Sequence, residues 1–319
     1  MRFFGNTNID FIGKRKIAYA ISIIVIIAGI VSLVINGGPK YSIDFTGGVA
    51  MELDLTPIAP DAKPIDIQTI RDVLTANGIE GSEIQTIRGM DKKRLVLIKT
   101  KLASGDEEKI STKIIDTIKR EFPGNVDPAT LIRLQEEVGP KIGGELKEKI
   151  ILAIFWSLLG IIIYIWWRFE FSFGLAAVAA LIHDVAITVG IFSIVGKEIS
   201  LPIVAALLTI VGYSLNDTIV VFDRIREDLR VFRKESYANV INHSINETLS
   251  RTIITSLTTF VVVLSLYVFG GSVIHDFAFA LLIGVVVGTY SSIFIASPLM
   301  VEHFKRRQKR QLTISGKKK

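Results

Sequence analysis

The chain contains no cysteine and only four histidines, so it has few of the side chains that bind transition metals. The absence of cysteine excludes disulfide bonds, thiol catalysis and metal sites with cysteine ligands. The histidines are scattered, and no His-Glu-x-x-His motif occurs. We therefore expect no metal site and no bound cofactor.

Charged residues are also scarce. They make up 21% of the chain, whereas about 25% is typical of soluble domains. Half of the residues are hydrophobic, and the mean hydropathy is +0.47. The net charge of +6 comes from basic residues between hydrophobic runs and in the tail, without a basic stripe interleaved with aromatic residues. These features predict a membrane protein that does not bind nucleic acid.

Six hydrophobic runs approach or exceed the roughly 17–20 residues that cross a bilayer core as a helix. The first run follows Lys14, Arg15 and Lys16 and is not followed by a signal-peptidase pattern, so we expect a retained anchor. The sequence thus predicts a polytopic membrane protein with six transmembrane helices. These helices are expected at 17–35, with residues 1–16 preceding them, and within 150–300 at 150–167, 173–195, 201–222, 251–269 and 274–300.

The links between these runs alternate in basic charge. The N-terminal segment, the link after the fourth run and the tail 301–319 are rich in lysine and arginine, whereas the links after the third and fifth runs share only Lys197. Because basic loops stay in the cytoplasm, we expect both termini there and residues 36–149 on the opposite side. Residues 223–247 mix charged and apolar positions, which favours either a helix along the cytoplasmic interface or a solvated connector helix.

Residues 36–149 have the pattern of a soluble α+β domain. Met51, Leu53 and Leu55 alternate with polar residues, as in a half-buried strand. A helical pattern, two strand-like runs, a second helical pattern and a last strand follow. This β-α-β-β-α-β order predicts a ferredoxin-like exported domain. The later elements are expected near Ile67–Leu74, Glu83–Arg88, Arg94–Thr100, Ile110–Ile118 and Leu131–Val138.

Ionisable residues inside the predicted spans are candidates for function, because each costs roughly 2.5–3.5 kcal/mol at a helix centre. Asp217 belongs to a polar island that also holds Gly212, Tyr213, Ser214, Asn216 and Thr218. Arg251 enters from the same side and could reach a similar depth. A carboxylate near a cation in an apolar environment can bind and release a proton. Two simpler roles are also possible: Asp217 is a structural contact between packed helices, and the Arg251 side chain only extends to the membrane interface.

Asp184 lies near the middle of the third run, beside His183. The two side chains point about 100° apart on a helix, so we do not expect them to share one partner. They could extend a proton route or only pack. In the sixth run, Gly284 and Gly288 form a G-x-x-x-G pair, which fits packing within this bundle at least as well as contact with another subunit.

The segment after the first span contains Asp44, Phe45, Thr46, Gly47 and Gly48. A glycine pair favours a turn or the entry to a strand. A phosphate-binding loop is not expected, because no helix start with lysine and serine or threonine follows.

These motifs together resemble the SecF family, the smaller subunit of the bacterial SecD–SecF complex, over nearly the whole chain. The residues that carry the resemblance are Phe11-Ile12 with Lys14-Arg15, Asp44 to Gly48, Val138 to Lys141, Gly212 to Glu227, Ser250 to Thr252, Gly270-Gly271 and Gly288 to Ser292.

The resemblance implies half of an RND-type transporter bundle in the bacterial cytoplasmic (inner) membrane. It implies SecD as a separate partner chain, and SecYEG, SecA and YajC as further partners in moving preproteins across the lipid membrane. The driving force would be the proton motive force. The family's essential membrane carboxylate falls on Asp217, and its arginine falls on Arg251.

Three other functions remain open on the residues. A small-molecule RND exporter usually contains two such halves, and this chain shows one. An aspartyl intramembrane protease would use Asp184 and Asp217, but its G-x-G-D signature is absent because Asn216 precedes Asp217. If the chain were only a structural anchor, neutralising Asp217 would not change its function. We expect a transport subunit and not an enzyme.

Overall fold

The computed structural model describes residues 7–59, 64–88, 94–101 and 107–316. It divides the chain into two compact units, which are described separately. The helical unit comprises residues 1–40, 154–197 and 202–319, and the α+β unit comprises residues 41–153 and 198–201.

The long helices follow the hydrophobic runs. In the part of the chain that the structure describes, six segments are long and apolar enough to cross a membrane, as the sequence predicts. The last of them passes through a short π-helical stretch between α9 and α10, in which the Ser297 hydroxyl donates to the Ser292 carbonyl at 2.7 Å. The helices are α1 (Arg15–Ile35), α5 (Pro140–Arg168), α6 (Phe171–Ile194), α7 (Leu201–Val231), α8 (Tyr237–Phe269), α9 (Ser272–Ser291), the π segment (Ser292–Ala296) and α10 (Ser297–Gly316).

The single helix expected over 223–247 does not form. Instead α7 continues to Val231, the chain turns, and α8 begins at Tyr237. The Ser236 side chain caps α8 by accepting a hydrogen bond from the Asn239 amide at 3.2 Å. The apolar positions assigned to one helix therefore belong to the ends of two long helices, because a serine cap interrupts the pattern.

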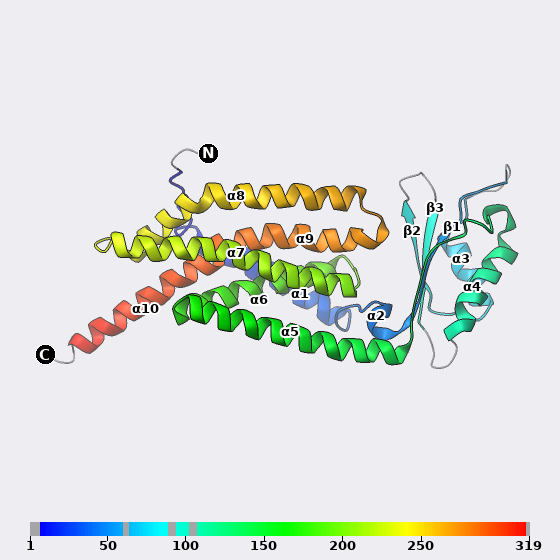
Figure 1. Cartoon of the computed structure of the whole chain (residues 1–319), viewed down its shortest axis with the longest axis horizontal. Coiled ribbons are helices and arrows are strands. Elements are labelled where there is room, and N and C mark those ends of the chain that lie inside the picture. Colours follow the sequence, from blue (N-terminus) through cyan, green and yellow to red (C-terminus); the bar gives the residue numbers. More distant parts are fainter. Residues whose placement is uncertain (1–6, 60–63, 89–93, 102–106, 317–319) are drawn as a thin grey trace. The chain divides into compact units, whose positions relative to one another are not determined.

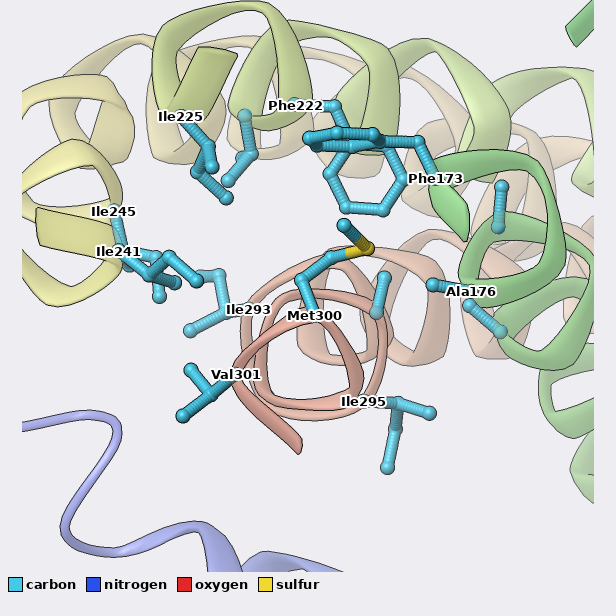
Figure 2. Packing of buried hydrophobic residues seen from close by; sticks show 14 of the residues in the cluster. Phe173, Ala176, Phe222, Ile225, Ile241, Ile245, Ile293, Ile295, Met300 and Val301 are labelled. Atoms are coloured by element: carbon cyan, nitrogen blue, oxygen red, sulfur yellow. The ribbon is translucent and has the colours of Figure 1, made fainter. Parts of the chain in front are cut away.

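The core of the helical unit gathers around α10. Figure 2 shows Met300 pointing toward the rings of Phe173 and Phe222. These two rings meet edge to face, with centroids 5.1 Å apart. Ile241 and Ile245 of α8 are buried in the same cluster. Buried side chains from α6, α7, α8 and α10 thus hold these helices in one bundle.

The α+β unit has the predicted order of elements. Its sheet is antiparallel with strand order β2-β3-β1-β4, and Figure 1 shows α3 and α4 on one side of the strands. Ile70 and Leu74 of α3 and Ile114 and Ile118 of α4 pack on the sheet in one apolar core. The ferredoxin-like designation stays a prediction. The elements are α2 (Ile43–Thr46), β1 (Gly48–Asp54), α3 (Ile67–Ala76), β2 (Glu83–Arg88), β3 (Arg94–Thr100), α4 (Glu107–Glu121), the 3-10 turn η1 (Pro123–Asn125) and β4 (Ile132–Val138).

Strand β1 differs from the half-buried strand expected from its alternation. It pairs with β3 on one side and β4 on the other, and every residue in it is buried. On its polar face, Asp54 accepts a hydrogen bond from Arg133 at 3.0 Å. The alternation is correct, but the central position in the sheet covers both faces.

Candidate functional site

Asp217 lies inside α7 and joins three helices. Its side chain is buried, with 2% exposure. One carboxylate oxygen accepts a hydrogen bond from the Ser256 hydroxyl of α8 at 3.2 Å. The Ser256 hydroxyl in turn accepts from Thr289 of α9 at 2.7 Å. A buried carboxylate with so few donors is poorly solvated, so a change in its protonation alters the contacts of three helices.

Arg251 does not contact Asp217 directly. Among the described residues its guanidinium makes no ion pair, and its side chain is exposed. Arg251 and Ser256 are five residues apart on α8, so they point about 140° apart on the helix. The positive charge of Arg251 still acts on the Asp217 carboxylate through space. The direct pair expected from depth alone is thus absent from this single chain.

Asp184 forms a second buried site. It is fully buried on α6, and one carboxylate oxygen accepts from Ser214 of α7 at 2.5 Å and from Ser291 of α9 at 2.7 Å. The other oxygen lies 2.8 Å from His183 Nδ1. The carboxylate thus links α6, α7 and α9.

His183 extends this site to the first helix. Its Nε2 lies 3.0 Å from the Ser22 hydroxyl of α1, which is 3.1 Å from the Tyr290 hydroxyl. The Tyr290 hydroxyl donates to the Ala18 carbonyl at 2.8 Å. As expected, His183 and Asp184 have different partners on other helices, but the histidine also bonds to the carboxylate next to it. The result is a continuous polar path from α7 to α1.

The two buried aspartates are not arranged as a catalytic pair. Asp184 binds Ser214 and Ser291, whereas Asp217 binds Ser256, and no hydrogen bond in the described part of the chain joins the two sites. A two-aspartate protease needs both carboxyl groups on one water molecule. The geometry therefore gives no support to a protease.

The other residues of the polar island face different ways. Ser214 and Thr218 are buried, whereas Gly212 and Asn216 are exposed. The Tyr213 hydroxyl is buried without a hydrogen-bond partner among the described residues. Gly212 and Asn216 continue an exposed stripe of small and polar side chains along α7 that includes Pro202, Ala205 and Thr209.

The glycine pair of α9 packs inside the bundle. A Cβ at Gly284 would lie 2.1 Å from Ile210, and one at Gly288 would lie 3.0 Å from the Ser214 Cβ. Both glycines therefore allow α9 to approach α7, which positions Ser291 at Asp184 and Thr289 at Ser256.

One further acidic group was not expected from the sequence. Ligand atoms of Asp228, His243 and Glu247 lie within 4.8 Å of one another where α7 meets α8. Arg224 forms an ion pair with Asp228 at 3.1 Å and also contacts Glu247. The guanidinium thus already neutralises these carboxylates, so the group is an ion-pair cluster.

Comparison with known proteins assigns the family. The model of the family described as protein export membrane protein SecD/SecF, C-terminal, matches residues 118–306. The protein translocase subunit SecF of Desulfurispirillum indicum is 48% identical over 297 residues, which cover 92% of this chain and 91% of that protein. The chain belongs to the SecF family. The SecF of Rhodothermus marinus is 44% identical over 308 residues, which cover 95% of each chain.

Two solved SecDF structures are similar to the whole chain. The crystal structure of SecDF from Thermus thermophilus, a translocon-associated membrane protein, is 37% identical with a TM-score of 0.81 and covers 94% of this chain. A SecDF in a super-membrane-facing form is also 37% identical, with a TM-score of 0.69, and covers 98% of this chain. This chain spans 39% and 41% of those two SecDF chains. It is a multi-pass membrane protein related to one part of SecDF.

Proposed function

We propose that this chain is the proton-coupling SecF subunit of a SecD–SecF complex that assists preprotein export. The observation that carries the proposal is Asp217, a buried carboxyl group that accepts from the Ser256 hydroxyl of α8, which in turn accepts from Thr289 of α9, with Arg251 in electrostatic range. Binding of a proton removes its charge, weakens its attraction to Arg251 and releases the hydroxyls from a charged acceptor. The contacts of α7 with α8 and α9 change as a result.

The energy available fits such a role. One proton moving across about 100 mV releases about 2.3 kcal/mol, and each pH unit of gradient adds about 1.4 kcal/mol. A few protons therefore suffice for a domain movement of a few kcal/mol. One of the two similar SecDF structures is described as a super-membrane-facing form, which supports a family that adopts more than one form. Protons are the coupling ion, and no other cofactor is proposed.

SecD is the proposed partner inside the membrane. The exposed stripe of α7, from Pro202 to Asn216, has small and polar residues where lipid contact favours large apolar ones. Arg251 is exposed on α8, where a second subunit could pair with it. The relation to one part of SecDF supports this partner. SecYEG, SecA, YajC and the translocating preprotein are proposed as further partners on the family relation.

The proposed location is the bacterial cytoplasmic membrane with both termini in the cytoplasm. The alternation of basic and uncharged links supports this orientation. The α+β unit then lies outside the membrane, where it can move against the corresponding part of SecD. Protease added to inverted vesicles should cleave the basic tail 301–319, and protection of the tail would contradict the orientation.

The deciding experiment measures preprotein translocation into inverted vesicles that contain this chain and its SecD, with and without a proton gradient. We expect the gradient to stimulate translocation with the unmodified chain and not with Asp217→Asn. The physical reason is that asparagine keeps the shape and the acceptor oxygen but cannot bind a proton.

Asp223→Asn is the matched control. Asp223 lies on the same helix, is partly exposed and bonds to Arg168 at 3.1 Å. This variant makes the same chemical change away from the buried site and should keep the gradient response. A gradient response in Asp217→Asn equal to that of the unmodified chain would exclude Asp217 from energy coupling.

A further inference from the structure

The segment Tyr41–Gly48 binds the start of the helix that carries Asp217. Both parts belong to the α+β unit, since this unit includes residues 198–201. The Leu201 amide, the first of α7, donates to Asp44 Oδ2 at 2.8 Å. The Ser42 amide donates to the Ile199 carbonyl at 3.0 Å, and Tyr41 forms a parallel bridge with Ile199. Asp44 thus caps α7 with a charge of the favourable sign.

Asp44 is held in place by its own turn. The Ser42 hydroxyl lies 3.0 Å from Asp44 Oδ2 and 3.3 Å from the Asp44 amide. Ile43 and Phe45 on either side are buried, so the one-turn helix α2 is fixed by packing. The carboxylate therefore reaches Leu201 from a rigid support.

The same segment also contacts the start of α5, with Lys147 over the Tyr41 ring at 4.8 Å from its centroid and with a close backbone approach at Gly143. A Cβ at Gly143 would lie 3.1 Å from the Gly47 amide nitrogen and from the Phe45 carbonyl oxygen. Gly47 has a φ of 73°, a left-handed conformation that other residues adopt at a cost. A side chain at Gly143 would therefore crowd the backbone of this turn.

The segment also joins the sheet directly. Gly48 is the first residue of β1, and a Cβ there would lie 2.7 Å from the Thr100 carbonyl of β3. On the other side, Lys99 of β3 forms an ion pair with Glu198 in the link before α7. Burial raises the pKa of Glu198, and the hydrogen bond and charge of Lys99 oppose this rise. The sheet, the start of α5 and the start of α7 therefore meet at one tight junction.

We propose that the segment Tyr41–Gly48 is the mechanical connection through which displacement of α7 reaches the sheet, with Asp44 as its positioning residue. The proposal rests on the function proposed for Asp217. Asp217 lies sixteen residues beyond Leu201 in the same unbroken helix, about 24 Å along its axis. Close-packed interiors compress little, so a shift of the helix end moves the groups that are packed against it.

The first test compares Asp44→Ala with Asp44→Asn in the full chain with SecD. Asparagine keeps an oxygen that caps the helix, whereas alanine removes it. We expect Asp44→Ala to reduce the gradient-dependent part of translocation roughly fivefold, the change expected for loss of a typical N-cap. Asp44→Asn should restore most of it, and translocation without a gradient should not change in either variant. Full gradient response in Asp44→Ala would overturn the proposal.

The second test locks the junction. The chain has no cysteine, so Tyr41→Cys with Ile199→Cys gives a single reactive pair, at two residues that face each other in a parallel bridge. We expect the oxidised pair to keep the gradient response, because the connection stays closed throughout the movement. Loss of the response on oxidation with recovery on reduction would show that the contact must open, and would overturn the proposal even if Asp44→Ala fails to assemble.

Asp217→Asn in the same vesicles separates the two proposals. If Asp217→Asn loses the gradient response and Asp44→Ala keeps it, only the mechanical connection fails. If Asp217→Asn also keeps it, the proposed function fails and the connection fails with it.

Discussion

At the scale of single residues, two buried carboxylates accept hydrogen bonds from serine hydroxyls of neighbouring helices. Each of the three hydroxyls that bond to these carboxylates comes from another helix: Ser214, Ser256 and Ser291 lie 30, 39 and 107 residues from the aspartate each one binds. In an apolar environment each such bond fixes the register of two helices.

We propose that Asp184 and His183 form a second proton site. Two substitutions of Asp184 test this proposal. Asp184→Ala leaves the Ser214 and Ser291 hydroxyls without an acceptor, so we expect a loss of about 2–4 kcal/mol in stability. Asp184→Asn keeps one acceptor oxygen and should fold, but it should lower the gradient response of translocation. Unfolding in denaturing detergent measures the first effect, and the vesicle assay measures the second. A full response in Asp184→Asn would leave the site with a structural role.

At the scale of elements, α1 and α6 touch through glycine. A Cβ at Gly29 would lie 2.7 Å from the Gly190 Cα, and one at Gly190 would lie 3.0 Å from the Gly29 Cα. The two backbones are in contact, and the hydroxyls of Ser32 and Ser193 bond at 2.8 Å near the same end of the pair. The path from His183 to Ser22 depends on this close approach.

We expect Gly29→Ala and Gly190→Ala each to cost about 1–3 kcal/mol, because each added methyl group forces the two backbones apart. Gly160→Ala on α5 is the control, since a Cβ there meets no atom within 4 Å, and it should gain up to about 1 kcal/mol from better helix propensity. Unfolding midpoints in detergent compare the three variants. A tolerated Gly29→Ala would show that the contact is loose.

Much of the element pattern could be predicted from the sequence, and the failures have physical causes. Apolar runs near bilayer length predict six helices because a helix is the way an apolar segment buries its own backbone groups. The alternation in β1 was correct, but the burial of both of its faces depends on β3 and β4. The sequence predicts one helix over 223–247, where α7 ends and α8 begins. The break depends on the cap formed by one residue, Ser236, which the spacing of apolar residues does not reveal.

The site was predicted in part. Asp217 and Asp184 stand out because charge is expensive in an apolar helix, and this reasoning needs no structure. Their partners Ser256 and Ser291 could not be found in this way, because serine is common in membrane helices and the contacts depend on how distant segments pack. The coupling roles of Asp217, Arg251 and Asp184 stay proposals.

At the scale of the whole molecule, many exposed side chains of the described helices are large and apolar, whereas the stripe along α7 is small and polar. The stripe at Gly212 and Asn216 is exposed, so Gly212→Leu should clash with a helix of SecD and reduce the SecD that copurifies with the chain about tenfold, equivalent to about 1.4 kcal/mol. Gly160→Leu is the matched control on α5, where a Cβ meets no atom within 4 Å. Unchanged copurification of SecD with Gly212→Leu would place the partner on another face.

The length of α7 has a consequence in time. The helix runs without a break for 31 residues, about 46 Å, from the Asp44 cap to the turn before α8. Helices adjust within about a microsecond, whereas domains rearrange over microseconds to milliseconds. In the proposed cycle, a protonation event at Asp217 would reach Leu201 within that time. Under the proposed function, the rate of each cycle would then be set by the arrival of protons or by the movement of the domains and the preprotein, and α7 itself would add no delay.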